Sequence, residues 1–397
     1  MSIFCWTLLW MLYLSIVNIG QEFYGFGWES LLLESGFIAI FLGDNSSPAF
    51  LPLIWFYRWL LFRLMFGAGL IKIRGDSCWR DYTCMYYHYE SQPMPGPTSR
   101  FFHHLPKWFH RLSVFINHFV ELFVVFFYFV PGPLGVVAGL ATIGFQLLIM
   151  AGGNFSWLNA ITLVLCIPCF NDTFLSSIGF DRLPAPEAPS LSWFVVSAAF
   201  FGFLLYRSYY PFLNLFSRQQ AMNRSFDRFH LVNTYGAFGS VTRNRPEIIF
   251  QGTMDAEVTP QTRWLEYEFK GKVGDPMRRS PQVTPYHYKL DWQLWFAAMS
   301  DYRYNTWVLN IIAKMLKADS QFLGLIRYDP FDGKRPRYVR AELYMYNYTK
   351  PGEKGWWNRR RMYSYIPPLS LNDEAFREFL RQEGWEKEKV SGEKARE

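Results

Sequence analysis

Long apolar runs alternate with polar loops over the first half of the chain. A helix that crosses a bilayer needs about 20 mostly apolar residues. Six runs approach this length, and we expect some of them to be re-entrant or interfacial: residues 2–19, 52–73, about 112–131, 134–151, 155–170 and 192–216. Pro131 and Pro133 separate two of the runs, since helices usually end before proline. The pattern predicts a multi-pass α-helical membrane region over residues 1–216.

Beyond residue 216 the periodicity becomes that of a soluble α+β domain. Apolar and polar positions alternate over residues 338–348, with Val339, Ala341 and Leu343 on one face, which is typical of a half-buried strand. Further elements are expected as strands at 247–251 and 264–270, an amphipathic helix at 305–317 and a short helix that follows Ser370 and ends at Gly384. The sequence therefore predicts a strand-rich soluble domain over residues 217–397.

Charge follows the same division. Residues 1–216 hold 10 Lys and Arg against 11 Asp and Glu, whereas residues 217–397 hold 30 against 22. A basic domain is compatible with nucleic acid, anionic lipid or an acidic protein. No nucleic-acid-binding motif accompanies the basic residues, so we expect no nucleic-acid partner. An acidic protein partner and a merely solvated basic surface both stay open.

Charged residues inside the apolar runs need a partner. Arg63 lies deep within the run at 52–73, and intramembrane charges normally pair with one another or face a polar cavity. Glu121 is the expected counter-ion. Arg58 is nearer the end of the run, where its long side chain can reach the interface.

Five of the seven histidines fall between His88 and His118, and Glu121 shares a helix face with His118. One hypothesis is a membrane-embedded, metal-dependent enzyme that uses the His88–Glu121 region. The paired H-x-x-x-H spacing of membrane di-iron enzymes is missing, which favours polar contacts that hold a loop against helices. Cys166-x-x-Cys169 lies in an apolar segment without the βαβ context of a redox motif. Asp291, beside two tryptophans, is expected to be structural. We predict no catalytic residue, metal site or cofactor.

Cys78 and Cys84 are the two cysteines that lie in a polar loop, at about 71–111. A disulfide there requires an oxidising compartment, but the basic excess of the loop favours the cytosol. These residues alone leave the side of the membrane open. Five Asn-x-Ser/Thr sequons occur, at Asn45, Asn154, Asn171, Asn223 and Asn347. Only Asn347 is well away from the apolar runs, so it is the candidate for glycosylation.

Five long stretches form a distinctive set: FGWESLLLESGFIAIFLG (26–43), RWLLFRLMFGAGLIKIRGD (58–76), CWRDYTCMYYHYESQPMPGP (78–97), HHLPKWFHR with NHFVEL (103–122), and the run from NTYGAFGS to DWQLWFAAM (233–299). On these motifs the chain resembles the lipase maturation factor family, and its type-1 branch more than its type-2 branch. The resemblance extends from about Gln21 to Trp385.

The resemblance implies a multi-pass membrane protein of the endoplasmic reticulum. It implies a chaperone-like factor, not an enzyme, that binds secreted dimeric lipases such as lipoprotein lipase and hepatic lipase. Membrane lipid is the other expected partner. It also implies that the C-terminal domain and the loop at 71–111 face the lumen and that the loop engages the lipase. A lumenal loop favours a disulfide between Cys78 and Cys84.

The chain departs from the family pattern in two places. Family members begin upstream with at least one more membrane helix, so we expect a short isoform or an incomplete gene product, with the topology of each end open. Type-1 members carry cysteines where Gly271 and Pro281 stand here, so a disulfide is expected to be absent at that point. The aromatic side chains of Trp356, Trp357 and the strand at 338–348 are candidate lipase contacts; the alternative is that they form the core of the domain. A transporter, suggested by Arg63 and Glu121, lacks the broken repeats of such folds.

Overall fold

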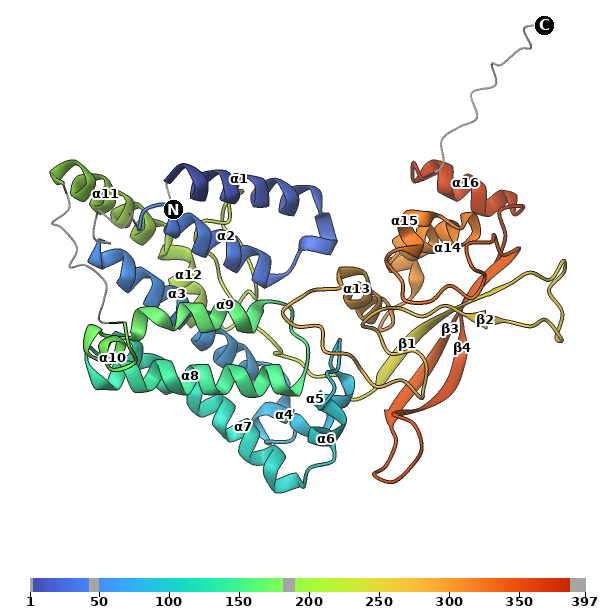
Figure 1. The fold of residues 1–397 in the computed structure, drawn as a ribbon, viewed down its shortest axis with the longest axis horizontal. Coiled ribbons are helices and arrows are strands. Elements are labelled where there is room, and N and C mark those ends of the chain that lie inside the picture. Colours follow the sequence, from blue (N-terminus) through green and yellow to red (C-terminus); the bar gives the residue numbers. More distant parts are fainter. Residues whose placement is uncertain (1–2, 43–49, 181–189, 386–397) are drawn as a thin grey trace, which may run out of the picture. The chain divides into compact units, whose positions relative to one another are not determined.

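The computed structural model describes residues 3–42, 50–180 and 190–385, and its chain divides into two compact units (Figure 1). The helical unit comprises Met1–Arg243 and Gln282–His287, and the sheet unit comprises Asn244–Pro281 and Tyr288–Glu397. Residues 217–243 and 282–287, which the sequence analysis assigned to the soluble domain, thus pack within the helical unit. The predicted fold class, a helical membrane region followed by a strand-containing domain, is confirmed.

The helical unit is built from long apolar helices and short polar ones. The long helices are α1 (Ile3–Ile19), α2 (Gly27–Ala39), α3 (Leu51–Arg74), α7 (Lys107–Leu122), α8 (Pro133–Gly152), α9 (Leu158–Leu165), α11 (Leu191–Arg207) and α12 (Tyr209–Phe216). The short elements are η1 (Gln21–Tyr24), α4 (Ser77–Arg80), α5 (Met85–Ser91), α6 (Ser99–His103), η2 (Val124–Phe129), η3 (Ile167–Cys169) and α10 (Asp172–Ser177). α3 lies at the centre, since residues from α2, η2, α8, α9 and α11 share its buried cluster.

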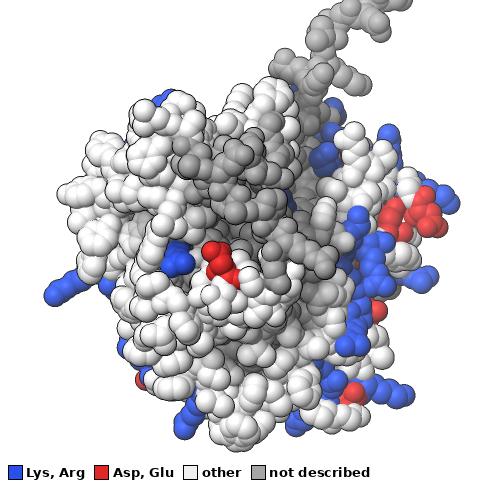
Figure 2. Space-filling view, turned by 60° about the vertical axis from the view of Figure 1, so that its left-hand side comes forward, with Lys and Arg blue, Asp and Glu red and all other residues white. Residues whose placement is uncertain are grey.

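Four helical segments of the described chain are long and apolar enough to cross a membrane: Leu51–Arg74, Lys107–Phe129, Pro133–Gly152 and Leu191–Phe216. The remaining two predicted runs form the shorter apolar helices Ile3–Ile19 and Leu158–Cys169. In Figure 2, which brings the left-hand side of Figure 1 forward, most of the described surface in front is uncharged. Exposed side chains such as Phe115, Phe119 and Leu148 suit a lipid environment.

Residues 20–50, which separate the first two apolar runs of the sequence, contain the helix α2. Its buried positions Leu31, Glu34 and Ile38 recur with helical spacing. The acidic residues within it concealed this pattern in the sequence. They face protein here, and so α2 contributes two buried carboxylates, those of Glu29 and Glu34, to the interior of the unit.

The sheet unit contains an antiparallel sheet of four strands in the order β2-β1-β3-β4. Its strands are β1 (Arg245–Thr253), β2 (Leu265–Glu266), β3 (Tyr338–Tyr348) and β4 (Trp357–Leu369). β3 has the predicted bounds and the predicted inward face, with Val339 and Ala341 fully buried. The predicted strand at 264–270 is shorter than expected, and it continues only as an isolated bridge between Glu268 and Tyr328. β4 was not predicted.

Helices cover one face of this sheet. They are α13 (Lys289–Ala297), η4 (Tyr302–Tyr304), α14 (Trp307–Lys317), α15 (Ser320–Leu323) and α16 (Glu374–Gln382). The apolar side of α14 and the inward residues of β3 belong to one buried cluster, as the amphipathic pattern predicted. α16 is capped by Asp373, which accepts from the Phe376 N–H at 3.2 Å, and not by Ser370.

The tyrosine-rich end of the sheet forms a second small core. Tyr346, Tyr348 and Trp357 are buried, and the rings of Tyr348 and Trp357 stack with centroids 4.0 Å apart. These aromatic side chains therefore stabilise the sheet unit itself. Their expected role as an exposed contact surface for a lipase is wrong for Trp357, while Trp356 is half-buried.

Candidate functional site

A buried ion pair joins α2 and α3. The Arg63 guanidinium pairs with the Glu34 carboxylate and also donates to the Asn233 carbonyl oxygen at 2.6 Å. Glu34 Oε2 accepts in addition from the Asn233 N–H at 2.9 Å and from the Tyr235 hydroxyl at 2.7 Å. The charges are thus compensated by several hydrogen bonds, which is the condition for burying an ion pair without a large loss of stability.

A second buried pair lies further along α3. Lys72 Nζ is 2.6 Å from Glu121 Oε1 and 2.9 Å from Asn117 Oδ1, and both partners are on α7. The expected pair of Arg63 with Glu121 is therefore wrong. Arg63 and Lys72 are nine residues apart, roughly two and a half helical turns, so they leave α3 on opposite sides. Only Lys72 faces α7.

Arg58 does not extend to an interface as expected. Its Nε donates to the Pro168 carbonyl at 2.7 Å, and its Nη1 donates to the Tyr128 carbonyl at 3.2 Å. The guanidinium also lies 4.5 Å from the centre of the Trp55 ring. Arg58 thereby satisfies carbonyl groups at the ends of η2 and η3 that lack helical partners.

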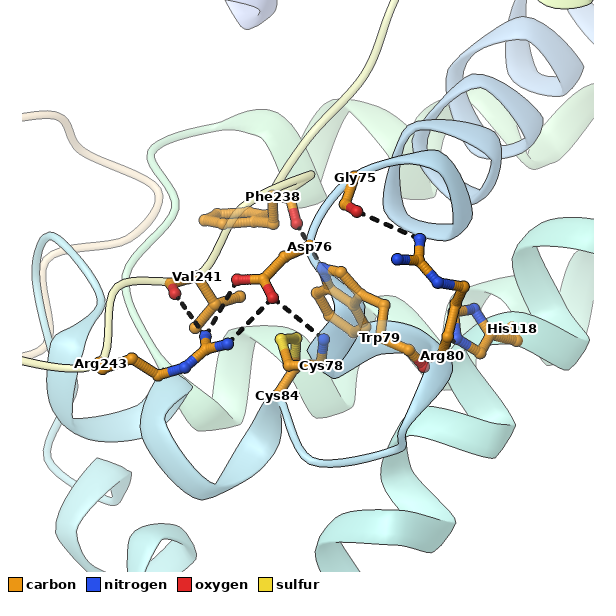
Figure 3. Close-up of a disulfide and its surroundings, with 10 residues drawn as sticks. All are labelled: Gly75, Asp76, Cys78, Trp79, Arg80, Cys84, His118, Phe238, Val241 and Arg243. Atoms are coloured by element: carbon orange, nitrogen blue, oxygen red, sulfur yellow. Dashed lines mark hydrogen bonds and ion pairs between the residues drawn. A yellow bond between two sulfur atoms is a disulfide. The ribbon is translucent and has the colours of Figure 1, made fainter. Parts of the chain in front are cut away.

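The polar loop after α3 is closed by a disulfide between Cys78 and Cys84 (Figure 3). Both cysteines are buried in a small cluster with Trp79, Val114 and Val241. The ring spans a sequence separation of six residues. The bond fixes the start of the loop against α7 and against the segment that precedes the sheet unit.

Asp76 connects the loop to Arg243. It caps α4 by accepting from the Cys78 N–H at 3.0 Å, and its two carboxylate oxygens accept from Arg243 at 2.9 and 3.0 Å (Figure 3). The hydrogen bonds from Arg243 hold the pKa of Asp76 below its usual value. Gly75 is needed here, because a Cβ at this position would collide with the Gly239 carbonyl oxygen.

Two further hydrogen bonds attach the loop to the segment at 236–243. The Trp79 indole N–H donates to the Phe238 carbonyl at 2.8 Å, and the Asp76 N–H donates to the Gly239 carbonyl at 2.9 Å. The loop residues Arg80, Asp81 and Tyr82, by contrast, are exposed. The disulfide and the segment at 236–243 thus present a short, fixed loop with an exposed tyrosine.

The histidines of the predicted histidine-rich region form separate contacts with different partners. His118 Nε2 is 3.1 Å from the Trp79 carbonyl, and His103 is 3.6 Å from a Glu90 oxygen. Desolvation, with a smaller effect of the Lys72 charge, lowers the pKa of His88 to about 4. The described residues contain no group of three His, Cys, Asp or Glu side chains placed to hold a metal ion. These histidines fix the loop and helix contacts around the disulfide.

Asn154 is a buried hydrogen-bonding centre that the sequence analysis treated only as a sequon. Its Oδ1 accepts from the backbone N–H groups of Val283 and Thr284, at 2.8 and 2.9 Å, and its Nδ2 donates to the Pro95 carbonyl at 3.1 Å. The side chain is fully buried. It joins the polar loop, the end of α8 and residues 282–287, so it is unavailable for glycosylation in the folded protein.

Cys166 and Cys169 are free and buried in the helical unit. The Cys166 thiol donates to the Thr162 carbonyl one turn earlier, at 3.2 Å. A thioredoxin-like motif requires a strand immediately before it in the sequence, whereas the described elements on either side of Cys166 and Cys169 are helices.

Asp291 of the sheet unit organises a tight turn. Its Oδ1 accepts from the N–H groups of Gly271 and Lys272, at 2.6 and 2.9 Å. Burial raises the pKa of Asp291 and lowers that of Lys272, which pairs with Glu247 at 2.7 Å. The turn at Gly271, where type-1 family members were expected to carry a cysteine, is therefore held by buried polar contacts.

Comparison with known proteins places these features in a family. The family model of the lipase maturation factor transmembrane domain matches residues 1–177, and that of the lipase maturation factor C-terminal domain matches residues 231–367. The chain belongs to the lipase maturation factor family. The resemblance drawn from its motifs is confirmed.

The matches to relatives extend over most of this chain and over at least 70% of each relative. Lipase maturation factor 1 of Homo sapiens is 43% identical over 95% of this chain and 72% of its own length, and that of Mus musculus is 42% identical over 96% and 72%. Lipase maturation factor 2 of Xenopus tropicalis is 27% identical over 95% and 70%. The chain is thus more similar to these type-1 relatives than to the type-2 relative. No solved structure matches it.

Family membership confirms that this is a membrane protein. The matched transmembrane domain contains three of the four candidate spans, those of α3, of α7 with η2, and of α8. The relatives are named maturation factors and not enzymes. Membership of this family implies a maturation factor and not an enzyme that uses the His88–Glu121 region.

Proposed function

We propose that the chain acts in lipase maturation as a folding factor of the endoplasmic reticulum membrane. It binds newly made secreted lipases, lipoprotein lipase and hepatic lipase among them, until they reach their active dimeric state. The observation that carries the proposal is the 43% identity with Lipase maturation factor 1 of Homo sapiens over 95% of this chain. Both family models match in addition.

The proposed mode of action is binding without catalysis. An unassembled subunit exposes apolar surface and unpaired strand edges that promote aggregation. A membrane-held factor lowers this risk by covering such surface for a short time. No covalent chemistry is required of the factor, so it needs no cofactor.

The disulfide-closed loop is the proposed contact of the helical unit with the lipase. Tyr82 is exposed at this loop, and the Cys78–Cys84 bond with the Asp76–Arg243 pair restricts the loop around it. A rigid contact loses less conformational entropy on binding than a flexible loop does. The disulfide also supports placement of this loop in the oxidising lumen.

The test is secretion of active lipase from cells that lack their own maturation factor, with and without this chain. Rescue is measured as lipase activity per amount of secreted lipase, at a known amount of inserted chain. We expect restored specific activity. Stable, inserted chain that restores none would overturn the proposal.

Histidine variants provide a second, mechanistic test. Alanine at His103, His104, His110 or His118 is expected to leave measurable rescue per amount of inserted protein. A binding surface loses function gradually, because only a minority of contact residues carry most of the binding energy. A metal-dependent enzyme would lose essentially all activity with one ligand, so complete loss in three of these variants at normal abundance would contradict a binding role.

A further inference from the structure

β4 forms one edge of the sheet, and most of that edge is open. β4 is last in the strand order β2-β1-β3-β4. Within the described chain, no backbone hydrogen bond from outside the sheet reaches residues 358–364. Asn358 and residues 360–364 are exposed. Such an edge presents unpaired N–H and C=O groups to which another extended chain can bind.

The backbone groups that point outward can be identified from the register. Thr349 N–H donates to the Trp356 carbonyl at 3.1 Å, which places the hydrogen-bonded pair of the ladder at Thr349 and Trp356 and the next, non-hydrogen-bonded pair at Tyr348 and Trp357. At this end of β4 the N–H groups of Trp356 and Trp357 both donate to the Pro276 carbonyl, at 2.9 and 3.0 Å. Pairing then runs without a shift from Tyr348↔Trp357 to Tyr344↔Arg361. Since hydrogen-bonded and non-hydrogen-bonded pairs alternate in an antiparallel ladder, the N–H groups of Arg359 and Arg361 also point outward.

A cavity of about 550 Å³ lies beside the C-terminal half of β4, next to the open part of its edge. It is lined by residues 298–302 together with Tyr363, Ser364, Tyr365 and Pro367 of β4. Met299 and Tyr363 are both partly exposed at its wall. Domains that bind a peptide as an added strand obtain affinity from the backbone of the edge and specificity from such side-chain pockets.

The charges on β4 favour an acidic occupant. Arg359 pairs with Glu266 at 2.8 Å and Arg361 pairs with Glu342 at 2.7 Å. Arg360, on the opposite face of the strand, is exposed and forms no ion pair among the described residues. Arg360 therefore carries the positive charge at this edge that an acidic side chain does not already compensate. It disfavours pairing with the same edge of a second copy and attracts an extended segment that carries Asp or Glu.

We propose that the open edge of β4 binds an extended, acidic segment of the immature lipase as a fifth strand of the sheet. A side chain of that segment occupies the cavity beside Tyr363, whose wall combines polar and apolar groups. This inference rests on the proposed function, because it takes the lipase to be the polypeptide that is bound. Backbone pairing makes few demands on sequence, which suits a factor that serves several lipases.

The decisive comparison is Arg361→Pro against Arg361→Ala in the full-length, membrane-inserted chain. Both variants lose the ion pair with Glu342, but only proline removes the outward N–H. An edge strand tolerates proline at a position whose N–H faces away from the sheet. Lipase cross-linked to the chain is expected to fall by about tenfold for proline relative to alanine.

A second pair of variants tests the cavity. Tyr363→Ala removes part of the cavity wall, whereas Tyr304→Ala changes a tyrosine that is 86% exposed and does not line it. We expect only Tyr363→Ala to reduce the amount of captured lipase. This pair decides the question if Arg361→Pro lowers the abundance of the chain.

Three results would overturn the inference. One is equal lipase capture by both Arg361 variants at equal abundance. Another is equal capture by the two tyrosine variants. The third is loss of self-association in Arg361→Pro with unchanged lipase capture, which would assign the edge to a second copy. Each of these leaves the proposed function intact if the wild-type chain rescues lipase secretion, whereas failure of that rescue rejects the proposed function.

Discussion

The guanidinium of Arg63 on α3 and the carboxylate of Glu34 on α2 form an ion pair whose side chains are 1% and 0% exposed. Glu34 also accepts from Asn233 and Tyr235, which follow the last apolar helix in the sequence. The pair therefore fixes three distant parts of the chain around one buried carboxylate.

Replacing Arg63 by methionine is expected to destabilise the helical unit by about 3–5 kcal/mol, because it leaves the Glu34 carboxylate buried without its counter-charge. The measurement is the thermal unfolding midpoint, or resistance to protease, of the chain in membranes or detergent. Arg58→Met is the matched control on the same helix. Among the described residues Arg58 donates to two carbonyl oxygens and lies over an aromatic ring, with no carboxylate paired to it, so a smaller loss is expected. Equal losses in the two variants would contradict the special role of the pair.

The disulfide predicts a defined alkylation pattern. Protein from the secretory pathway, denatured without reductant, should be alkylated at Cys5, Cys166 and Cys169 but not at Cys78 or Cys84. After reduction all five cysteines should react. Loss of the bond in Cys84→Ala should cost about 2 kcal/mol of stability by the loop-entropy model. Peptide mass spectrometry that finds Cys78 alkylated before reduction would show that the bond does not form in cells.

The Asp76–Arg243 pair predicts a pH-dependent contribution to stability. The folded pKa of Asp76 is depressed, so the pair stabilises the fold above the unfolded pKa of about 3.9, and this stabilisation is lost as the pH falls through the folded pKa. Arg243 is 41% exposed, which limits the contribution to about 1 kcal/mol or less. Asp76→Asn should therefore lower the unfolding midpoint at pH 7, and its difference from the wild type should shrink as the pH falls below the unfolded pKa and vanish below the folded pKa. Asp81→Asn, at an exposed position in the same loop, is the control.

Asn347 remains the predicted glycosylation site. It is exposed on β3, and Thr349 completes its sequon. Asn347→Gln should abolish an endoglycosidase-sensitive shift of electrophoretic mobility. Asn154→Gln should leave that shift unchanged, since Asn154 is buried. Because N-glycans are attached only in the lumen, absence of a glycan from Asn347 would remove this support for a lumenal sheet unit.

The elements that could be predicted are those with one buried face, because such burial leaves a regular spacing of apolar residues in the sequence. β3 shows strict alternation because one of its faces is buried, and α14 shows a helical stripe for the same reason. β4 lacks any such period, since residues 360–364 are exposed regardless of the face on which they lie. Its arginine-rich sequence resembled a polar loop.

The polar network could not be predicted from local pattern. Glu34 meets Asn233 across 199 residues, and Lys72 meets Glu121 across 49 residues. Glu29 and Glu34 of α2 are five residues apart, about 140° around the helix, so periodicity alone does not place both of them in the interior. Arg63 pairs with Glu34 and not with Glu121 because the side of α3 that carries Arg63 faces α2 and not α7. The sequence of each apolar run does not determine which side of a helix faces which neighbour.

Asn154 has a consequence for the order of synthesis. The chain passes between the two units at 243/244, 281/282 and 287/288, and the donors that satisfy Asn154 are at residues 282–284. α8, after which Asn154 follows, leaves the ribosome long before those donors do. The Oδ1 of Asn154 therefore meets these donors only after the first segment of the sheet unit, residues 244–281, has been translated. The helical unit can therefore be completed only after the first segment of the sheet unit has been synthesised. A nascent chain that stalls before residue 282 lacks the last segment of the helical unit as well as the remainder of the sheet unit.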